Sequence, residues 1–180
     1  MTLNEFQKMV AESFPLQMPD KSRLFEGVRI ESGHERLQIL QTIAWPNLTV
    51  EIIGEILNEF FQLSSVWQKY FLPAAITLTS NATLDLNEFG EIEDGNQEAL
   101  CEFVFYYWVS IGFLQNAEFQ AKENIFSGLT TPQIMCVAHW INAVDFEALA
   151  RVGQVPSNFN HSKEGLAQFI KMMNDLKLTD

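Results

Sequence analysis

Residues 64–79 read SSVWQKYFLPAAITLT, a stretch that combines a helix start, a dense aromatic face and an internal proline. Ser64 or Ser65 can begin a helix, because a serine hydroxyl accepts hydrogen bonds from the first backbone N–H groups. Apolar residues then recur at the spacing of one helix face: Trp67, Tyr70, Phe71, Ala74, Ala75 and Leu78. The stretch predicts a helix with one broad apolar stripe.

Pro73 lies in the middle of this predicted helix. Proline has no N–H group to donate, and its ring presses on the carbonyl of Lys69, at a cost of about 3 kcal/mol unless packing compensates. We therefore expect a kink or a brief break at Pro73. Two interpretations stay open, a structural bend in the core and a bend that opens a pocket beside Tyr70.

Size and charge limit the class of protein. The chain of 180 residues is within the range of a single domain and can bury about 70% of its unfolded surface. Its 11 basic and 23 acidic residues give a net charge of −12, which argues against a nucleic-acid partner because such binding depends on cations. Cys101 and Cys136 lie in apolar segments and are typical of buried free thiols in a reducing compartment, with a single disulfide left open.

Nothing in the pattern predicts export or membrane insertion. The first residues, MTLNEFQKMVAESF, carry acids where a secretory signal has a basic end and an apolar run. The strongly apolar uncharged run from Phe103 to Ala117 is shorter than the about 20 residues of a membrane-spanning helix. We therefore expect a cytoplasmic protein without membrane contact.

The chain begins with a predicted helix, and a connector without regular helix signals follows it. Thr2 and Glu5 have the spacing of a capping box, which predicts a helix from Leu3 to about Phe14 with one apolar face: Leu3, Phe6, Val10 and Phe14. An ordered connector follows to Gly33, fastened to the core by Leu24, Phe25, Val28 and Ile30; residues 28–30 could form a short strand.

Two more helices are predicted before residue 64. One runs from His34 or Glu35 to about Ala44 and places five apolar residues together: Leu37, Ile39, Leu40, Ile43 and Ala44. The other starts after Thr49, with the apolar residues Ile52, Ile53, Ile56, Leu57 and Phe60. Gly54 lowers the stability of this helix by about 1 kcal/mol relative to alanine, which indicates close packing at that position.

The second half predicts a central helix. Residues 97–116 are apolar almost all round from Phe103 onward, so residues 103–114 should lie at the centre of the core. A further helix start is formed by Thr130, Thr131, Pro132 and Gln133, and the apolar residues Ile134, Val137, Ala138 and Ile141 follow it. A last helix is predicted from about Lys163 to Leu176.

The prediction is an all-α fold, mostly α-helical, over residues 1–180: a single compact multi-helix domain with a central apolar helix and a proline-kinked neighbour. Residues 80–96 could form a loop or a small hairpin.

Three stretches together carry a family resemblance: LFEGVRI at Leu24–Ile30, IAWPNLTVEII from Ile43, and WQKYFLPA ending at Ala74. The chain resembles a family of small bacterial proteins without an established activity that shares an F-x-G-V start, a tryptophan before a helix, an aromatic Y-F/Y-L-P-A helix and a late L-T-P-Q helix start. LTTPQ at Leu129–Gln133 has one extra threonine relative to that last pattern. The resemblance spans about residues 24–144 and implies a compact bacterial domain, with no catalytic residue.

Few residues offer catalytic chemistry. The histidines are His34, His139 and His161, and no metalloprotease, phosphate-loop or nucleophile-elbow motif is present. Cys136 and His139 lie one helical turn apart and are the nearest approach to a ligand or nucleophile pair, although two ligands do not make a metal site. Packing for Cys136 and a partly exposed or hydrogen-bonded His139 is the simpler interpretation, and we expect no metal and no cofactor.

A calcium loop is excluded by spacing. Asp85 and Asn87 could be the first two ligands of an EF-hand loop with Gly90 at its sixth position. Phe89 then occupies the fifth position and Asn96 the twelfth, where carboxylates are needed. The acidic residues of this segment are therefore better explained by their charge.

The charge pattern suggests a binding surface. No Lys or Arg occurs between Lys69 and Lys122, whereas eight acidic residues do. Such a run can be a solvated surface or a docking surface, in which apolar residues give affinity and charges select the partner. For the docking surface, the partner-binding residues are Asp85, Glu88, Phe89, Glu91, Glu93, Asp94 and Glu98.

Two function classes follow. One is a non-catalytic bacterial protein-binding domain, monomeric when free, such as an immunity protein or antitoxin that neutralises a basic toxin or effector. The other is an enzyme of unknown reaction with a pocket near Tyr70 and His139. The second requires both side chains to line one pocket with a carboxylate in reach.

Overall fold

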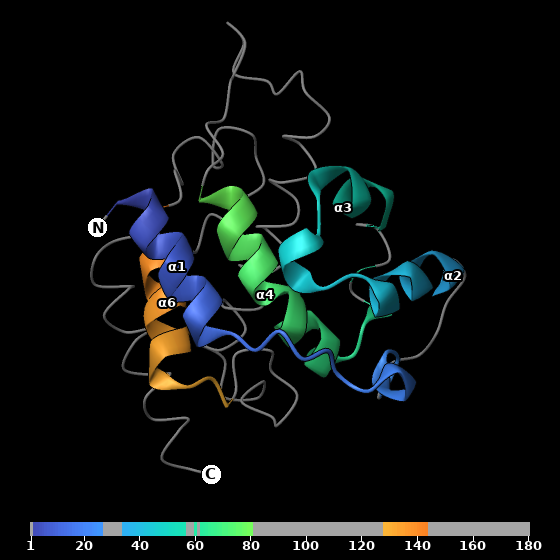
Figure 1. Cartoon of the computed structure of the whole chain (residues 1–180). Coiled ribbons are helices and arrows are strands. Elements are labelled where there is room, and N and C mark those ends of the chain that lie inside the picture. The colour runs from blue at the N-terminus through green and yellow to red at the C-terminus, as the bar shows by residue number, and fades with distance from the viewer. Residues whose placement is uncertain (1, 27–33, 57–59, 61, 81–127, 144–180) are drawn as a thin grey trace, which may run out of the picture.

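The computed structural model describes residues 2–26, 34–56, 60, 62–80 and 128–143, and every regular element in this part of the chain is a helix (Figure 1). The all-α prediction is confirmed. The α-helices are α1 (Leu3–Ser13), α2 (His34–Leu37), α3 (Val50–Ile56), α4 (Ser65–Thr79) and α6 (Thr131–Ala143), and short 3₁₀ helices span Lys21–Arg23, Gln38–Thr42 and Trp45–Asn47. The strand considered at 28–30, the segment 80–96, the predicted central helix 103–114, Cys101, His161 and the last predicted helix lie outside the described residues.

Helix α1 begins with the predicted capping box. The Thr2 hydroxyl accepts from the Glu5 backbone N–H at 3.3 Å, and the Glu5 carboxylate accepts from the Thr2 backbone N–H at 2.6 Å. Phe6 and Val10 are buried as predicted. Leu3 is 45% exposed, so its predicted place on the buried face is wrong. It is the first residue of the helix.

Residues 34–42 do not form the continuous α-helix that the sequence predicts. One α-helical turn, α2, is followed by a 3₁₀ helix from Gln38 to Thr42. A 3₁₀ helix has three residues per turn, so side chains three apart lie above one another. Leu37 and Leu40 are accordingly buried, and Ile43 packs partly against the same core. Ile39 is not in this row of side chains and is 46% exposed.

Helix α3 is described from Val50 to Ile56, and residues 57–59 and 61 of the predicted helix lie outside the described part of the chain. Ile53 and Ile56 are buried, as is Phe60. Gly54 is exposed, so the close packing expected at this glycine is not found.

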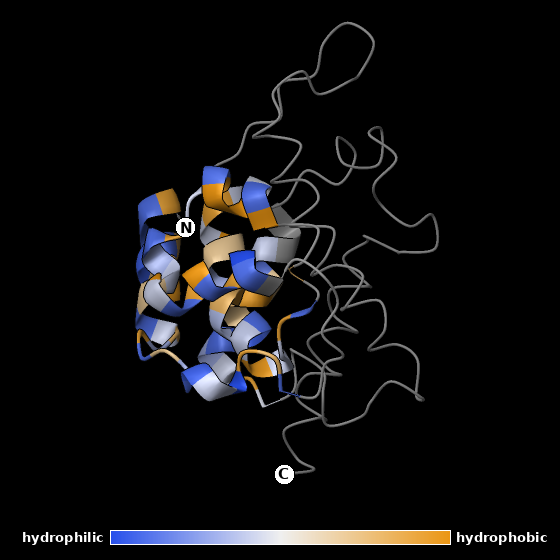
Figure 2. Ribbon diagram, turned by 90° about the vertical axis from the view of Figure 1, so that its right-hand side faces the viewer, coloured by the Kyte–Doolittle hydropathy of each residue, from blue (hydrophilic) through white to orange (hydrophobic). Residues whose placement is uncertain are grey.

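Helix α4 is the best-buried element of the described chain, packed against α1, α6 and the Trp45–Asn47 turn. It runs as one α-helix from Ser65 to Thr79, so the break considered at Pro73 does not occur. Leu72 and Ile76 are buried as well as the predicted stripe, of which only Leu78 is partly buried. Neighbours lie on more than one side of the helix. The residue-by-residue hydropathy of the described helices appears in Figure 2.

The start of α4 differs from the predicted serine cap. Ser64 occupies the cap position, but its hydroxyl makes no hydrogen bond and is buried. Its backbone N–H instead donates to the Leu24 carbonyl at 2.8 Å, and the Gln68 side chain donates to the Leu63 carbonyl at 2.7 Å. The backbone before α4 is therefore fixed by the chain around Leu24, and the serine hydroxyl does not contribute.

Helix α6 begins as the sequence predicts. Thr130 and Gln133 form a capping box, with the Gln133 amide oxygen accepting from the Thr130 backbone N–H at 2.8 Å. Gly128, just before it, has φ +65°, a backbone conformation that glycine adopts without steric cost. Helix α6 runs antiparallel to α1 (Figure 1). Among the described residues, no helix has the length and apolar character needed to cross a membrane.

Candidate functional site

A pocket of about 330 Å³ lies beside Tyr70, between residues 14–23, helix α4 and the start of α6. Its apolar lining comes from Phe14, Pro15, Met18, Pro19, Val66 and Tyr70. Its polar lining comes from Gln17, Asp20, Arg23, Lys69 and Gln133. A pocket is therefore present beside Tyr70, but Pro73 is not among its lining residues, so it is not tied to a bend at that proline.

One wall of the pocket is irregular backbone held by aromatic donors. The Trp45 indole N–H donates to the Pro15 carbonyl, and the Trp67 indole N–H donates to the Asp20 carbonyl, both at 3.2 Å. The Tyr70 hydroxyl donates to the Leu16 carbonyl, also at 3.2 Å. The Asp20 carbonyl also accepts from the Arg23 backbone N–H at 3.0 Å, in the 3₁₀ helix. Side chains of the core thus help to fix this wall at three backbone carbonyls.

Tyr70 serves as part of that wall. Its ring packs edge-to-face against Trp67 and Phe71, at centroid distances of 5.8 and 5.1 Å. Its hydroxyl also accepts from the Trp45 backbone N–H at 3.3 Å. Burial raises the pKa of Tyr70 above its usual value, against a smaller lowering by the Trp45 hydrogen bond. A neutral phenol with two hydrogen bonds is suited to hold the wall and poorly suited to accept a proton from a substrate.

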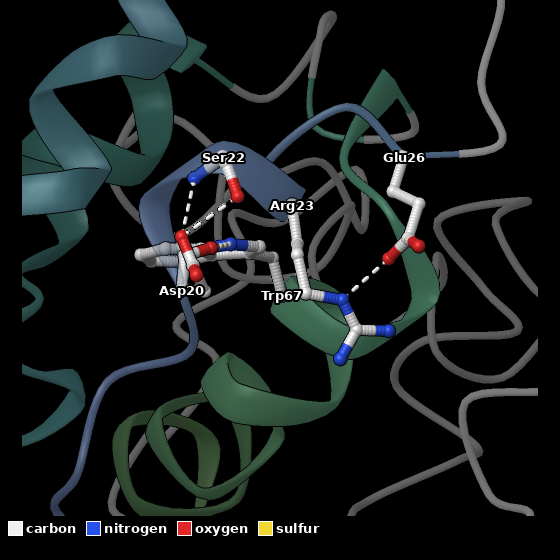
Figure 3. Close-up of polar contacts among 5 residues, drawn as sticks. All are labelled: Asp20, Ser22, Arg23, Glu26 and Trp67. Atoms are coloured by element: carbon white, nitrogen blue, oxygen red, sulfur yellow. Dashed lines mark hydrogen bonds and ion pairs between the residues drawn. The ribbon is translucent and has the colours of Figure 1, made fainter.

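Two lining residues of the pocket, Asp20 and Arg23, belong to an ordered set of polar contacts (Figure 3). The Asp20 carboxylate accepts from both the Ser22 backbone N–H, at 2.9 Å, and the Ser22 hydroxyl, at 2.8 Å. These two bonds lower the pKa of Asp20, with a small further effect from Arg23. The Nε group of Arg23 donates to Glu26. The two Nη groups of the guanidinium are not part of that contact.

Two further polar lining residues, Lys69 and Gln133, come from α4 and α6. Lys69 is half-buried and reaches toward Gly128, where an added Cβ would lie 3.8 Å from the Lys69 Nζ atom. The oxygen of the Gln133 amide is used in the capping box of α6. The NH₂ group of that amide is not part of the box. The pocket lining therefore includes the side chains of Arg23 and Lys69 and the amide of Gln133.

The structure does not bring Tyr70 and His139 together. His139 does not line the pocket, and it lies six residues beyond Gln133, about 9 Å further along α6. It is exposed, and its ring contacts the edge of Phe6 at a centroid distance of 5.6 Å. The pairing on which the enzyme hypothesis depends is not formed.

Cys136 and His139 also have different surroundings. Cys136 is a free thiol and fully buried, and this burial raises its pKa, while a hydrogen bond with Ser13 acts in the opposite direction to a smaller extent. A raised pKa disfavours the thiolate that a nucleophile or metal ligand needs. Within the described residues, no three His, Cys, Asp or Glu side chains are grouped to hold a metal ion.

The predicted partner-binding residues, from Asp85 to Glu98, lie outside the described part of the chain. The sequence reasoning placed a pocket beside Tyr70 but missed the residues opposite it. A usable signal was present: Pro15 and Pro19 predict extended backbone with unpaired carbonyls, and nearby aromatic donors can satisfy them.

Comparisons with protein-family models, with curated proteins and with solved structures found no match to this chain. The family resemblance in residues 24–144 therefore stays a prediction.

Proposed function

We propose that this chain is a non-catalytic bacterial protein-binding domain that neutralises a basic effector through an acidic segment, as an immunity protein or antitoxin does. The segment is residues 85–102, with Phe89 as the apolar contact among the acidic side chains. On this proposal the protein acts in the cytoplasm, as a monomer when free, and without a cofactor.

The observation that carries the proposal is the uneven distribution of charge. Residues 81–127 contain nine acidic residues and one basic residue, a net charge of −8 out of −12 for the chain. The described residues, by contrast, contain seven acidic and five basic residues, a net charge of −2. Solubility alone requires only that charge be spread over the surface, whereas concentrated charge attracts an oppositely charged partner.

Concentrated acidity has a defined kinetic effect. Opposite charges raise the association rate of two proteins, and salt screens the effect over a Debye length of about 8 Å at physiological ionic strength. An aromatic side chain buried in the interface acts mainly on dissociation. The proposal therefore assigns fast capture to the acids and slow release to Phe89.

Two of the described side chains that offered catalytic chemistry, Tyr70 and Cys136, are held in the structure in ways that do not suit catalysis, which supports a binding function. The Tyr70 hydroxyl bridges two backbone groups. The Cys136 thiol is buried with a raised pKa.

The experiment is affinity capture from the native host with identification of the bound protein, followed by association kinetics of the purified pair at several salt concentrations. The test variant reverses three charges: Glu91→Lys, Glu93→Lys and Asp94→Lys. We expect a basic partner, an association rate that falls as salt rises, and a fall of about tenfold or more in the variant.

The matched control reverses three exposed acids of the described helices: Glu12→Lys, Glu35→Lys and Glu55→Lys. It changes the net charge by the same amount at other places. Equal losses in the two variants would show that total charge matters and not the segment. Undiminished capture by the Glu91, Glu93 and Asp94 variant at every salt concentration would overturn the proposal.

A further inference from the structure

We propose that the pocket beside Tyr70 binds a small uncharged molecule that has an apolar body and a carbonyl group. The residues that line this pocket all lie outside the acidic segment of the proposed function in the sequence. The site would give the domain a small-molecule ligand in addition to a protein partner.

The size and lining of the pocket suit a small apolar body. Its volume of about 330 Å³ is at the lower end of the range for ligand sites and fits a molecule of about one ring and a short chain. The lining includes the rings of Phe14 and Tyr70 and the side chains of Met18 and Val66. These can cover the body of a ligand and remove its apolar surface from water.

One wall of the pocket is held in place by hydrogen bonds. Tyr70 and Trp67 donate to the backbone carbonyls of residues 16 and 20 at 3.2 Å, and their rings contact each other. Binding would therefore order little of this side of the site, which lowers the entropic cost of association.

The charged side chains of the lining favour an uncharged ligand. Arg23 donates to Glu26, Lys69 has an interaction partner of its own, and the Asp20 carboxylate accepts two hydrogen bonds from Ser22. Both signs of charge therefore occur in the lining, and each charged group is already engaged within the protein. A charged ligand would lose hydration there without an unpaired opposite charge to compensate, whereas an uncharged ligand has less hydration to lose.

The amide of Gln133 supplies a donor for a carbonyl group. Gln133 is half-buried and lines the pocket from the first turn of α6. Its oxygen accepts from the Thr130 backbone N–H at 2.8 Å, which fixes the orientation of the planar amide group. The NH₂ group takes no part in that bond and can donate to a carbonyl oxygen.

The test compares three probes with the same aromatic body: phenylpropanamide, phenylpropionate and phenylpropylamine. At pH 7 the first is uncharged, the second is an anion and the third is a cation. Binding to the full chain is followed by titration of amide NMR shifts, which also locate the site. We expect a dissociation constant of about 1 mM for phenylpropanamide, as for other ligands of this size. Both charged probes should bind at least about fivefold more weakly, because their lost hydration is not compensated.

Gln133→Glu tests the assigned donor. Glutamate keeps an oxygen that can accept from the Thr130 N–H, so the capping box is retained, but it has no NH₂ group. We expect phenylpropanamide to bind about fivefold more weakly, with unchanged thermal stability. Gln17→Glu is the matched control, because it makes the same change of charge at an exposed lining residue. Its effect should be less than about twofold.

Preference for phenylpropanamide over both charged probes, with shifts at the lining residues and a selective loss in Gln133→Glu, supports the proposal. Equal or tighter binding of either charged probe would overturn it. Equal effects of Gln133→Glu and Gln17→Glu would overturn it too, as would shifts confined to residues away from the pocket. The same holds if phenylpropanamide at about 10 mM, well above the expected dissociation constant, gives no shifts. None of these outcomes bears on capture of a basic protein, since the acidic segment uses other residues.

Discussion

The hydroxyl group of Tyr70 donates to the carbonyl oxygen of Leu16 at 3.2 Å, although the two residues are 54 positions apart in the chain. The same oxygen atom accepts from the Trp45 backbone N–H at 3.3 Å. One phenol therefore joins helix α4 to the segment after α1 and to the turn before α3. It also places the aromatic wall of the pocket.

Tyr70→Phe should lower the free energy of unfolding by about 1–3 kcal/mol, because a buried N–H group and a part-buried carbonyl lose their partner while the ring packing is kept. Urea denaturation measures the loss. Amide hydrogen exchange gives a local measurement: exchange at Trp45 should accelerate more than exchange at Ile53, whose N–H donates to the Thr49 carbonyl. Equal acceleration at both positions would show that the hydroxyl does not fix this turn.

A second hydroxyl links α4 to α6. The Thr79 side chain donates to the Ala75 carbonyl at 2.6 Å and accepts from the Trp140 indole N–H at 2.7 Å. Thr79→Val should therefore cost about 1–3 kcal/mol of unfolding free energy, because the buried indole N–H loses this acceptor.

Thr77→Val is the matched control for Thr79. Thr77 lies two residues earlier on the same helix, and its hydroxyl donates to the Pro73 carbonyl at 2.8 Å, within its own helix. Its replacement should change the unfolding free energy by no more than about 0.5 kcal/mol. A similar cost for both substitutions, measured by chemical denaturation, would mean that the bond from Trp140 adds nothing.

Local signals predicted the helix starts well. Thr2 with Glu5 and Thr130 with Gln133 each form the box that their spacing indicates, because both partners lie within one turn. The same local reasoning was wrong at Ser64, where the geometry of the start of α4 is determined by a bond to the distant Leu24 carbonyl. A cap is predictable from sequence when no long-range contact competes with it.

The pocket depends on contacts that no local pattern contains. The proline helix suggested a cavity beside Tyr70, and that helix does form one wall. The facing wall is irregular, and its position follows from the indole bonds of Trp45 and Trp67 to carbonyls 30 and 47 residues away. Pairings at such distances depend on the tertiary structure, so Asp20 and Arg23 could not be assigned to a site from the sequence.

Alkaline pH should destabilise the protein through Cys136 and Tyr70. Burial raises both pKa values above their ordinary values of 9.0 and 10.0, so the folded chain keeps these protons to higher pH than the unfolded chain. The stabilising contribution is complete below about pH 9 and is lost as pH rises, by at most about 1.4 kcal/mol per pH unit for each group. Urea denaturation from pH 7 to 10.5 measures it. The decline above pH 9 should be shallower in Cys136→Ala, and an identical slope would contradict the assignment to this thiol.

The final prediction contrasts two cap positions. Thr130→Ala should lower the free energy of unfolding by about 1 kcal/mol, because it removes the oxygen that accepts from the Gln133 backbone N–H. Ser64 occupies the corresponding position of α4, but its hydroxyl is buried without a hydrogen bond. Ser64→Ala removes a desolvated polar group that has no partner, so it should be neutral or stabilise the protein by up to about 1 kcal/mol. Thermal and urea denaturation of the two variants side by side check the difference in sign. A loss at Ser64 as large as that at Thr130 would mean that the Ser64 hydroxyl does cap α4 in solution.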